Sequence, residues 1–170
     1  LRGGALEVVL QPTGAPGTYE GSLTAQGARL FNAPALTELL SAISVVGLLD
    51  QINGGGIGLE TIQAQFRLSP DLLTVYQASA VGSSLGLSLD GLYNLRNEAM
   101  DFQGVLSPVY FVNAIGRIFS PRQGEGLFGF NFTMRGPAEN PQVTVNPLSI
   151  LTPGMFREIF RRPPPPRVSQ

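Results

Sequence analysis

The sequence predicts a mainly β fold of the α+β class, in which about eight strands form a curved antiparallel sheet accompanied by two or three helices. Polar and apolar residues alternate with a period of two in segment after segment, and turn residues separate these segments at intervals of about 8–14 residues. Helical spacing of apolar residues in other segments predicts the helices. A chain of 170 residues is long enough for one domain with a sizeable core.

The alternation is clearest at Thr61–Leu68 and Glu125–Arg135, where apolar side chains occupy one phase and polar side chains the other. Turn residues at Pro12–Gly17 and Ser69–Asp71 separate neighbouring segments. Three of the segments, the first, the fourth and the last, show the pattern more weakly. The predicted strands, in order, are Ala5–Gln11, Thr18–Gly27, Thr61–Leu68, Leu72–Val81, Ser84–Leu95, Glu98–Leu106, Glu125–Arg135 and Gln142–Val145.

The longest predicted helix is Asn32–Ile52, with Asn32 as its cap and Pro34 in its first turn. A second helix is predicted from Ser107-Pro108 to about Phe119, and a third after Asn146-Pro147, interrupted at Thr152-Pro153 and continuing to Phe160. The domain is expected to end at residue 162. The proline-rich residues 163–170 are expected to form a disordered tail.

The composition narrows the possible functions. The net charge is −1, and His, Cys, Trp and Lys are absent, which argues against the usual zinc, haem and iron–sulfur sites, against histidine-dependent nucleophiles and against a Walker A loop. We therefore expect neither an enzyme nor a cofactor, and no nucleic-acid partner. No run of 18 apolar residues predicts a membrane-spanning helix. The start at Leu1-Arg2-Gly3-Gly4 is interpreted as that of a fragment of a larger protein.

Two candidate sites have simpler explanations. Asn53–Gly58 is glycine-rich, but it leaves a helix and enters a strand, the reverse of the order that a phosphate loop needs, so we interpret it as a helix stop. The carboxylate pairs Asp90 with Asp101 and Glu125 with Glu139 lie on polar strand phases or in turns. Solvated surface is the default interpretation of both pairs, and an acid–base pair is the alternative.

Two apolar groups have a structural and a functional interpretation. The Phe128, Phe130, Phe132 and Met134 stripe is either the buried face of a central strand or one wall of an apolar groove. The segment Met155–Arg162 is either a helix packed on the sheet or an amphipathic helix that contacts a membrane or a partner. Its candidate contact residues are Met155, Phe156, Ile159 and Phe160.

Several short strings, in order and spacing, resemble a known family. They are Gly21–Thr24, Arg29–Pro34, Leu39–Ser41, Gly47–Asp50, Gly82–Gly91, Gly124–Phe130, Arg135–Pro141, Val145–Ser149 and Pro153–Arg157. Together they resemble the C-terminal region of AsmA-like proteins of Gram-negative bacteria, nearest to the YhdP branch as found in alphaproteobacteria. The resemblance covers nearly the whole chain except the proline-rich tail.

The resemblance implies a bridge-like lipid transporter. In this family, a transmembrane helix upstream anchors the protein in the inner membrane, and a long β-sheet folded into a taco-like groove crosses the periplasm and shields phospholipid acyl chains, which supports outer-membrane integrity. The chain would then be a non-enzymatic periplasmic segment that continues the upstream sheet of the full-length protein, with a membrane surface as a possible further contact. The expected lining is Leu85, Leu87, Leu89, Phe102, Leu106, Phe128, Phe130 and Phe132.

A second hypothesis belongs to a different class. The helices and the sheet would close into a compact α+β domain without a groove, and the domain would serve as a structural or docking module at the C-terminus of an envelope protein. The alternation alone does not separate the two hypotheses, because both need apolar side chains on one phase of each strand.

Overall fold

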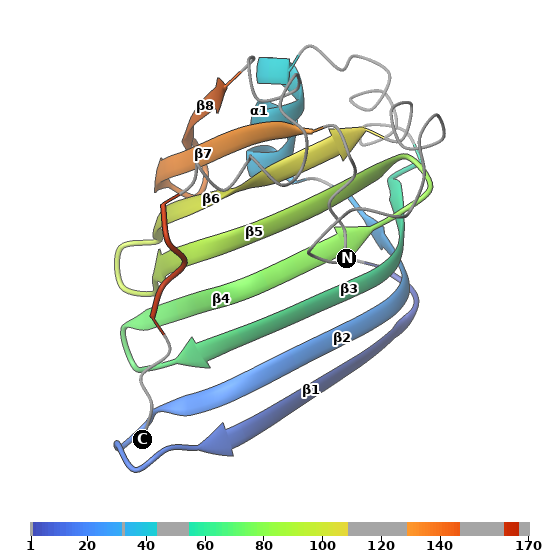
Figure 1. Ribbon diagram of the computed structural model, residues 1–170. Helices are drawn as coiled ribbons and strands as arrows, with labels where there is room; N and C mark the ends of the chain where they lie inside the picture. Colours follow the sequence, from blue (N-terminus) through green and yellow to red (C-terminus); the bar gives the residue numbers. More distant parts are fainter. Residues whose placement is uncertain (1, 32, 44–54, 109–128, 147–161, 167–170) are drawn as a thin grey trace.

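The computed structural model describes residues 2–31, 33–43, 55–108, 129–146 and 162–166. The eight strands in these ranges form one antiparallel sheet whose spatial order is the order of the chain (Figure 1). This confirms the predicted mainly β fold with an antiparallel sheet. The strands are β1 (Ala5–Pro12), β2 (Tyr19–Leu30), β3 (Ile57–Leu68), β4 (Leu72–Val81), β5 (Leu85–Asn94), β6 (Ala99–Pro108), β7 (Phe130–Pro137) and β8 (Gln142–Asn146).

Short turns fix the pairing of several neighbouring strands. Between β3 and β4, the Ser69 backbone N–H donates to the Leu72 carbonyl oxygen at 2.9 Å, which closes the turn predicted from Ser69–Asp71. Between β5 and β6, the Asn94 side-chain oxygen accepts the backbone N–H groups of Arg96 and Asn97. Asn side chains favour such turns because they replace a backbone acceptor locally. The long strands bend visibly toward one end of the sheet in Figure 1.

A bulge in β4 explains why its alternation is weak in the sequence. The pairing with β3 shifts between Gln65 and Phe66, so that Phe66 lies opposite Val75 while Gln65 lies opposite Gln77. The extra residue, Tyr76, changes the phase of the strand, since a bulge places two residues opposite one. Apolar positions are therefore odd-numbered before Tyr76 and even-numbered after it.

The helix α1 (Pro34–Ile43) packs against β7 and β8. Its first turn begins where the Ala33 carbonyl oxygen accepts the Thr37 backbone N–H at 2.9 Å. The first turn has no acidic residue and the last turn has no basic residue, so no side-chain charge in these turns stabilises the helix by interacting with its dipole. Packing of one apolar stripe stabilises the helix instead, and this stripe consists of the buried residues Leu36, Leu39 and Leu40.

The structure confirms one predicted helix in part and contradicts the start of another. Pro34–Ile43 lies inside the predicted helix Asn32–Ile52, whose cap Asn32 and residues 44–54 are outside the described ranges. Ser107 and Pro108 were predicted to begin a helix, but they end β6, where they pair with Gly86 and Leu85. The rest of the second predicted helix, and nearly all of the third, lie outside the described residues. One helix is therefore described where two or three were predicted.

Residues 162–166 are extended and lie along one face of the sheet (Figure 1). The sequence predicted disorder for 163–170, and the structure describes its first four residues, Pro163–Pro166, which line a cleft together with residues of β4, β5 and β6. Residues 167–170 lie outside the described ranges. Residues 162–166, which we call the tail, and α1 lie on opposite faces of the sheet. The tail binds side chains of the polar phase, and α1 packs on the apolar phase.

Candidate functional site

One face of the sheet is apolar from the first strand to the last. Residues directly opposite one another in paired strands project their side chains to the same face. Following the pairing from β1 to β8 therefore collects one continuous set of positions, which we call the apolar face. Its members are Leu6, Val8, Leu10, Tyr19, Gly21, Leu23, Ala25, Ile62, Ala64, Phe66, Leu68, Leu73, Val75, Ala78, Ala80, Leu85, Leu87, Leu89, Gly91, Tyr93, Met100, Phe102, Gly104, Leu106, Phe130, Phe132, Met134, Gly136, Val143 and Val145, and none of these is charged. Beyond Ala25 and Ile62, the same phase of β2 and β3 continues to Arg29 opposite Gly58, while the buried residues Leu59 and Ile57 lie on the other phase.

Glycine and phenylalanine lie opposite each other at three places on this face. The pairs are Gly21–Phe66, Gly91–Phe102 and Gly104–Phe132. In each pair, a Cβ added to the glycine would meet the ring of its partner, so the ring lies over the glycine. Such pairing covers the backbone that a glycine leaves bare. It also keeps these three aromatic rings close to the sheet.

Helix α1 divides the apolar face into two parts. The covered part packs with Leu39 and Leu40 of the helix into the hydrophobic core, and its residues Leu85, Leu106, Phe132 and Met134 are buried. The open part is formed by β1, β2 and the adjoining ends of β3 and β4. Its exposed residues are Leu6, Val8, Leu10 and Tyr19, its partly buried residues are Leu23, Phe66, Leu68 and Leu73, and at its border Ala25 and Val75 are buried.

The predicted lining residues do share one face. Leu85, Leu87, Leu89, Phe102, Leu106, Phe130 and Phe132 all belong to the apolar face, while Phe128 lies outside the described residues. Three of them, Leu85, Leu106 and Phe132, are between 0 and 2% exposed, and they belong to the core cluster that contains α1. The candidate membrane contacts Met155, Phe156, Ile159 and Phe160 also lie outside the described residues.

Strand β1 is the most exposed strand of the sheet. It lies at the sheet edge and pairs with β2 on one side. Leu6 is 64% exposed and Val8 47% exposed on the apolar face, while Val9 is 43% exposed on the opposite face. An exposed edge with apolar side chains is a template for a further strand. The sequence had placed the predicted lining in β5–β7 and overlooked these positions.

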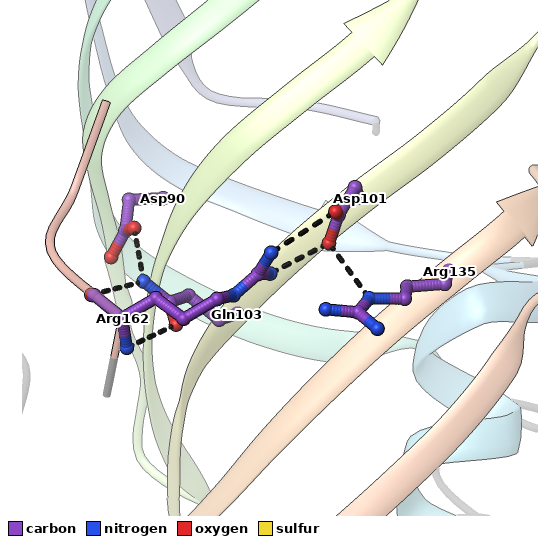
Figure 2. A network of polar contacts seen from close by, with 5 residues as sticks. All are labelled: Asp90, Asp101, Gln103, Arg135 and Arg162. Carbon is purple, nitrogen blue, oxygen red and sulfur yellow. Dashed lines mark hydrogen bonds and ion pairs between the residues drawn. The ribbon is translucent and has the colours of Figure 1, made fainter. Parts of the chain in front are cut away.

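The opposite face carries a polar network around the C-terminal segment (Figure 2). Gln103, which is 5% exposed, accepts the Arg162 backbone N–H at 3.0 Å through its side-chain oxygen. Its side-chain NH₂ group donates to the Arg162 carbonyl oxygen at 2.7 Å and to Asp90 at 2.9 Å. Asp90 is 2% exposed, so the expectation that it is solvated is wrong. The side chain of Gln103 thus binds the main chain of a residue 59 positions away.

Asp101 holds the side chain of the same arginine. The two terminal nitrogens of Arg162 donate to the two carboxylate oxygens of Asp101 at 2.6 and 3.1 Å, and Arg135 donates to Asp101 at 3.2 Å (Figure 2). Hydrogen bonds from Arg162 lower the pKa of Asp101, against the effect of partial burial, and Arg135 lowers it further. Asp101 raises the pKa of Arg162 in turn. Both groups are therefore charged at neutral pH.

This arrangement is suited to binding rather than to acid–base chemistry. Asp101 carries a lowered pKa and is held by two arginines, whereas a general acid needs a carboxyl group that keeps its proton near neutral pH. Among the described residues, no group of three acidic side chains could hold a metal ion. Within the same ranges, no helix has both the length and the apolar character to cross a bilayer.

The sequence offered little signal for the polar network. No local pattern marks the residues of the network, which are Asp90, Gln103 and Arg162. Gln103 and Arg162 are 59 residues apart in the chain, so only the folded structure shows that they are in contact. The directly opposite pairing of Asp90 and Gln103 follows only once the β5–β6 register is known. Comparison with protein-family models, with curated proteins and with solved structures gave no match.

Proposed function

We propose that the chain is a non-enzymatic segment of a lipid-conducting protein, and that its apolar face shields phospholipid acyl chains between the inner and outer membranes. The observation that carries the proposal is the apolar face itself, whose members named above extend across eight paired strands and include no charged residue. It agrees with what the resemblance to AsmA-like proteins implies, a periplasmic segment anchored through an upstream part of the full-length protein.

The dimensions of the face suit an acyl chain. Seven intervals between eight strands, each about 4.8 Å, make the sheet roughly 33 Å across. Half of a bilayer's hydrocarbon core is about 15 Å thick, which is the depth that one leaflet's acyl chains fill. Each buried methylene group contributes about 0.8 kcal/mol of transfer free energy, so a smooth apolar surface of this size holds a chain without specific contacts.

The open part of the face is where we place the lipid. Leu23 and Phe66 are partly buried there, and the neighbouring β1 residues are exposed. Leu106 and Phe132, by contrast, already contact the core that includes α1, so they support the sheet beneath the helix in this proposal. The lipid path therefore runs over β1–β4 rather than over the residues that the sequence favoured.

The edge strand supports the same proposal. Its apolar residues at Leu6, Val8 and Leu10 would be costly as a permanent water-facing edge of the sheet. A sheet that continues upstream of β1 in the full-length protein would pair with this edge and extend the apolar face. The upstream sheet is thus the partner that the proposal assigns to β1.

Site-specific photo-crosslinking tests the proposal. A benzoyl-phenylalanine residue placed at Leu23 or Phe66 of the full-length protein in living bacteria should capture phospholipid. The same residue at Thr24 or Gln65, the adjacent positions on the polar face, serves as the matched control and should capture none. Equal capture on the two faces, or none at Leu23 and Phe66, would contradict the proposal.

The closed docking module remains the second candidate, because α1 buries Leu39 and Leu40 completely against the sheet. In that case, crosslinkers at Leu23 and Phe66 should capture protein and no lipid. The same experiment therefore separates the two candidates by the mass of what is captured.

A further inference from the structure

We propose that the polar face of the sheet carries a peptide-binding site that is specific for an arginine followed by prolines, and that the C-terminal segment of the chain is its resident ligand. The site is formed by Gln103, Asp90 and Asp101 on β5 and β6, with a cleft of about 750 Å³ beside them. It lies on the face opposite to the proposed lipid surface, so it does not depend on that function.

The first element of the site recognises main chain. Gln103 uses both ends of its side-chain amide on one residue, accepting the N–H of Arg162 and donating to its carbonyl oxygen. This is the pairing that an extended strand would offer, supplied here by one side chain. Asp90 accepts a second hydrogen bond from the same NH₂ group at 2.9 Å, which fixes the orientation of the amide. Because Gln103 and Asp90 lie directly opposite each other in β5 and β6, the sheet itself holds the pair in place before a ligand binds.

The second element recognises the arginine side chain. Asp101 accepts two parallel hydrogen bonds from the guanidinium group of Arg162. Such a two-bond pair suits the planar fork of arginine and not the single ammonium group of lysine. Arg135 of β7 donates to the same carboxylate from the side away from Arg162 (Figure 2). The position therefore selects arginine by geometry as well as by charge.

The third element explains the prolines. Proline has no backbone N–H, so the four residues after Arg162 present no donor that needs a partner on the sheet. Their preferred extended conformation is already formed before binding, which lowers the entropy cost of ordering them. The prolines line one side of the cleft, and Thr74, Gly91 and Leu92 line its sheet side. Pro165 is partly buried there, and the other three prolines are exposed.

Binding of a free peptide tests this site in the intact chain. The variant Arg162→Glu places a carboxylate against Asp101 and should release the resident segment. A dye-labelled acetyl-Arg-Pro-Pro-Pro-Pro peptide should then bind at least about tenfold more tightly to Arg162→Glu than to the wild type, in which the resident segment competes at high effective concentration. Fluorescence anisotropy measures the binding, and Arg162→Ala is a second variant that vacates the arginine position.

Matched controls make the test specific. Adding Asp101→Asn to Arg162→Glu should weaken peptide binding about tenfold, because the two-bond arginine contact is lost. Adding Asp71→Asn, which breaks the exposed Arg96–Asp71 ion pair in a different turn, should leave peptide binding unchanged. Peptides with lysine in place of arginine, or with alanine in place of the prolines, should bind more weakly.

Two outcomes would overturn the proposal. One is equal peptide affinity for the wild type and for both Arg162 variants, which would mean that the resident segment does not occupy the site. The other is equal binding of the arginine, lysine and alanine peptides, which would remove the assigned specificity. Thermal melts of each variant confirm that differences in binding arise in a folded chain.

Discussion

The covered and open parts of the apolar face both consist of apolar side chains on one phase of paired strands. They differ because α1 packs on the covered part only. Under α1, Leu85, Leu106 and Phe132 are buried in a core. In β1, Leu6 and Val8 belong to the same face and remain about half-exposed or more. The pattern of one strand therefore does not determine whether its apolar side chains form a core or a surface, because that depends on which other element packs above them.

The largest expected difference between the two parts concerns a buried charge. Phe132→Asp places a carboxylate at a position that is 2% exposed, and we expect the free energy of unfolding to fall by about 4 kcal/mol or more. Val8→Asp places the same group at a position that is 47% exposed, and we expect a change within about 1 kcal/mol. Urea denaturation measures both. Similar losses would show that the open part is also a core.

Hydrogen exchange should separate the same two regions without any substitution. The amides of β6 lie inside the sheet, between β5 and β7 and beside the core, while β1 is an edge strand whose residues are all exposed. We expect the amides of β6 to exchange at least about 100-fold more slowly than those of β1, since local opening of β1 exposes little apolar surface. Native-state exchange read by mass spectrometry would show this directly. Uniform protection across the sheet would remove the distinction.

Glycine substitutions probe the packing of the covered part more gently. A Cβ at Gly104 would meet the Ser88 carbonyl oxygen and the Phe132 ring, whereas a Cβ at Gly58 meets nothing within 4 Å. We expect Gly104→Ala to lower the free energy of unfolding by about 2 kcal/mol through overpacking. Gly58→Ala, the matched control in β3, should leave it nearly unchanged. A harmless Gly104→Ala would mean that the Phe132 ring moves aside easily.

These differences also show what the sequence could predict. All eight strands were found by their alternation, because a period of two survives wherever one face of a sheet is apolar. Among the elements in the described residues, the end of β6 at Ser107-Pro108 was the point of error, and the bulge at Tyr76 made the alternation of β4 weak. A bulge changes the phase within one strand, and Ser-Pro is also a common way to begin a helix, so a local pattern does not decide either point.

The candidate site was predictable in a similar, partial way. The sequence placed Leu85, Leu106 and Phe132 correctly on one face, because each occupies the apolar phase of its strand. It did not show that α1 lies over them, since the contact joins segments that are far apart in the chain. The network of Asp90, Gln103 and Arg162 escaped for the same reason. Polar residues carry no periodic signal that would indicate a partner 59 residues away.

The smallest expected effect tests whether the tail, rather than α1, stabilises the covered half of the sheet. Asp101→Asn removes the ion pair with Arg162 on the polar face, directly behind the core strands. Both side chains are partly exposed, so solvent screens the pair, and we expect the free energy of unfolding at pH 7 to fall by about 1 kcal/mol or less. A loss as large as that of Phe132→Asp would show that the tail is part of the core structure.

Protonation of Asp101 at low pH should lower the free energy of unfolding of the wild type by a similarly small amount. The pKa of Asp101 is lower in the folded chain than its ordinary value, so its pairing stabilises the fold at neutral pH and above the ordinary carboxyl range. That contribution decreases as the pH falls below about 4 and the carboxylate takes up a proton. In a pH titration from 7 to 2, the wild type should therefore lose slightly more stability than Asp101→Asn, with the difference appearing below about pH 4. Identical acid profiles would mean that Asp101 and Arg162 are not paired in solution, and the covered part would then owe its stability to α1 alone.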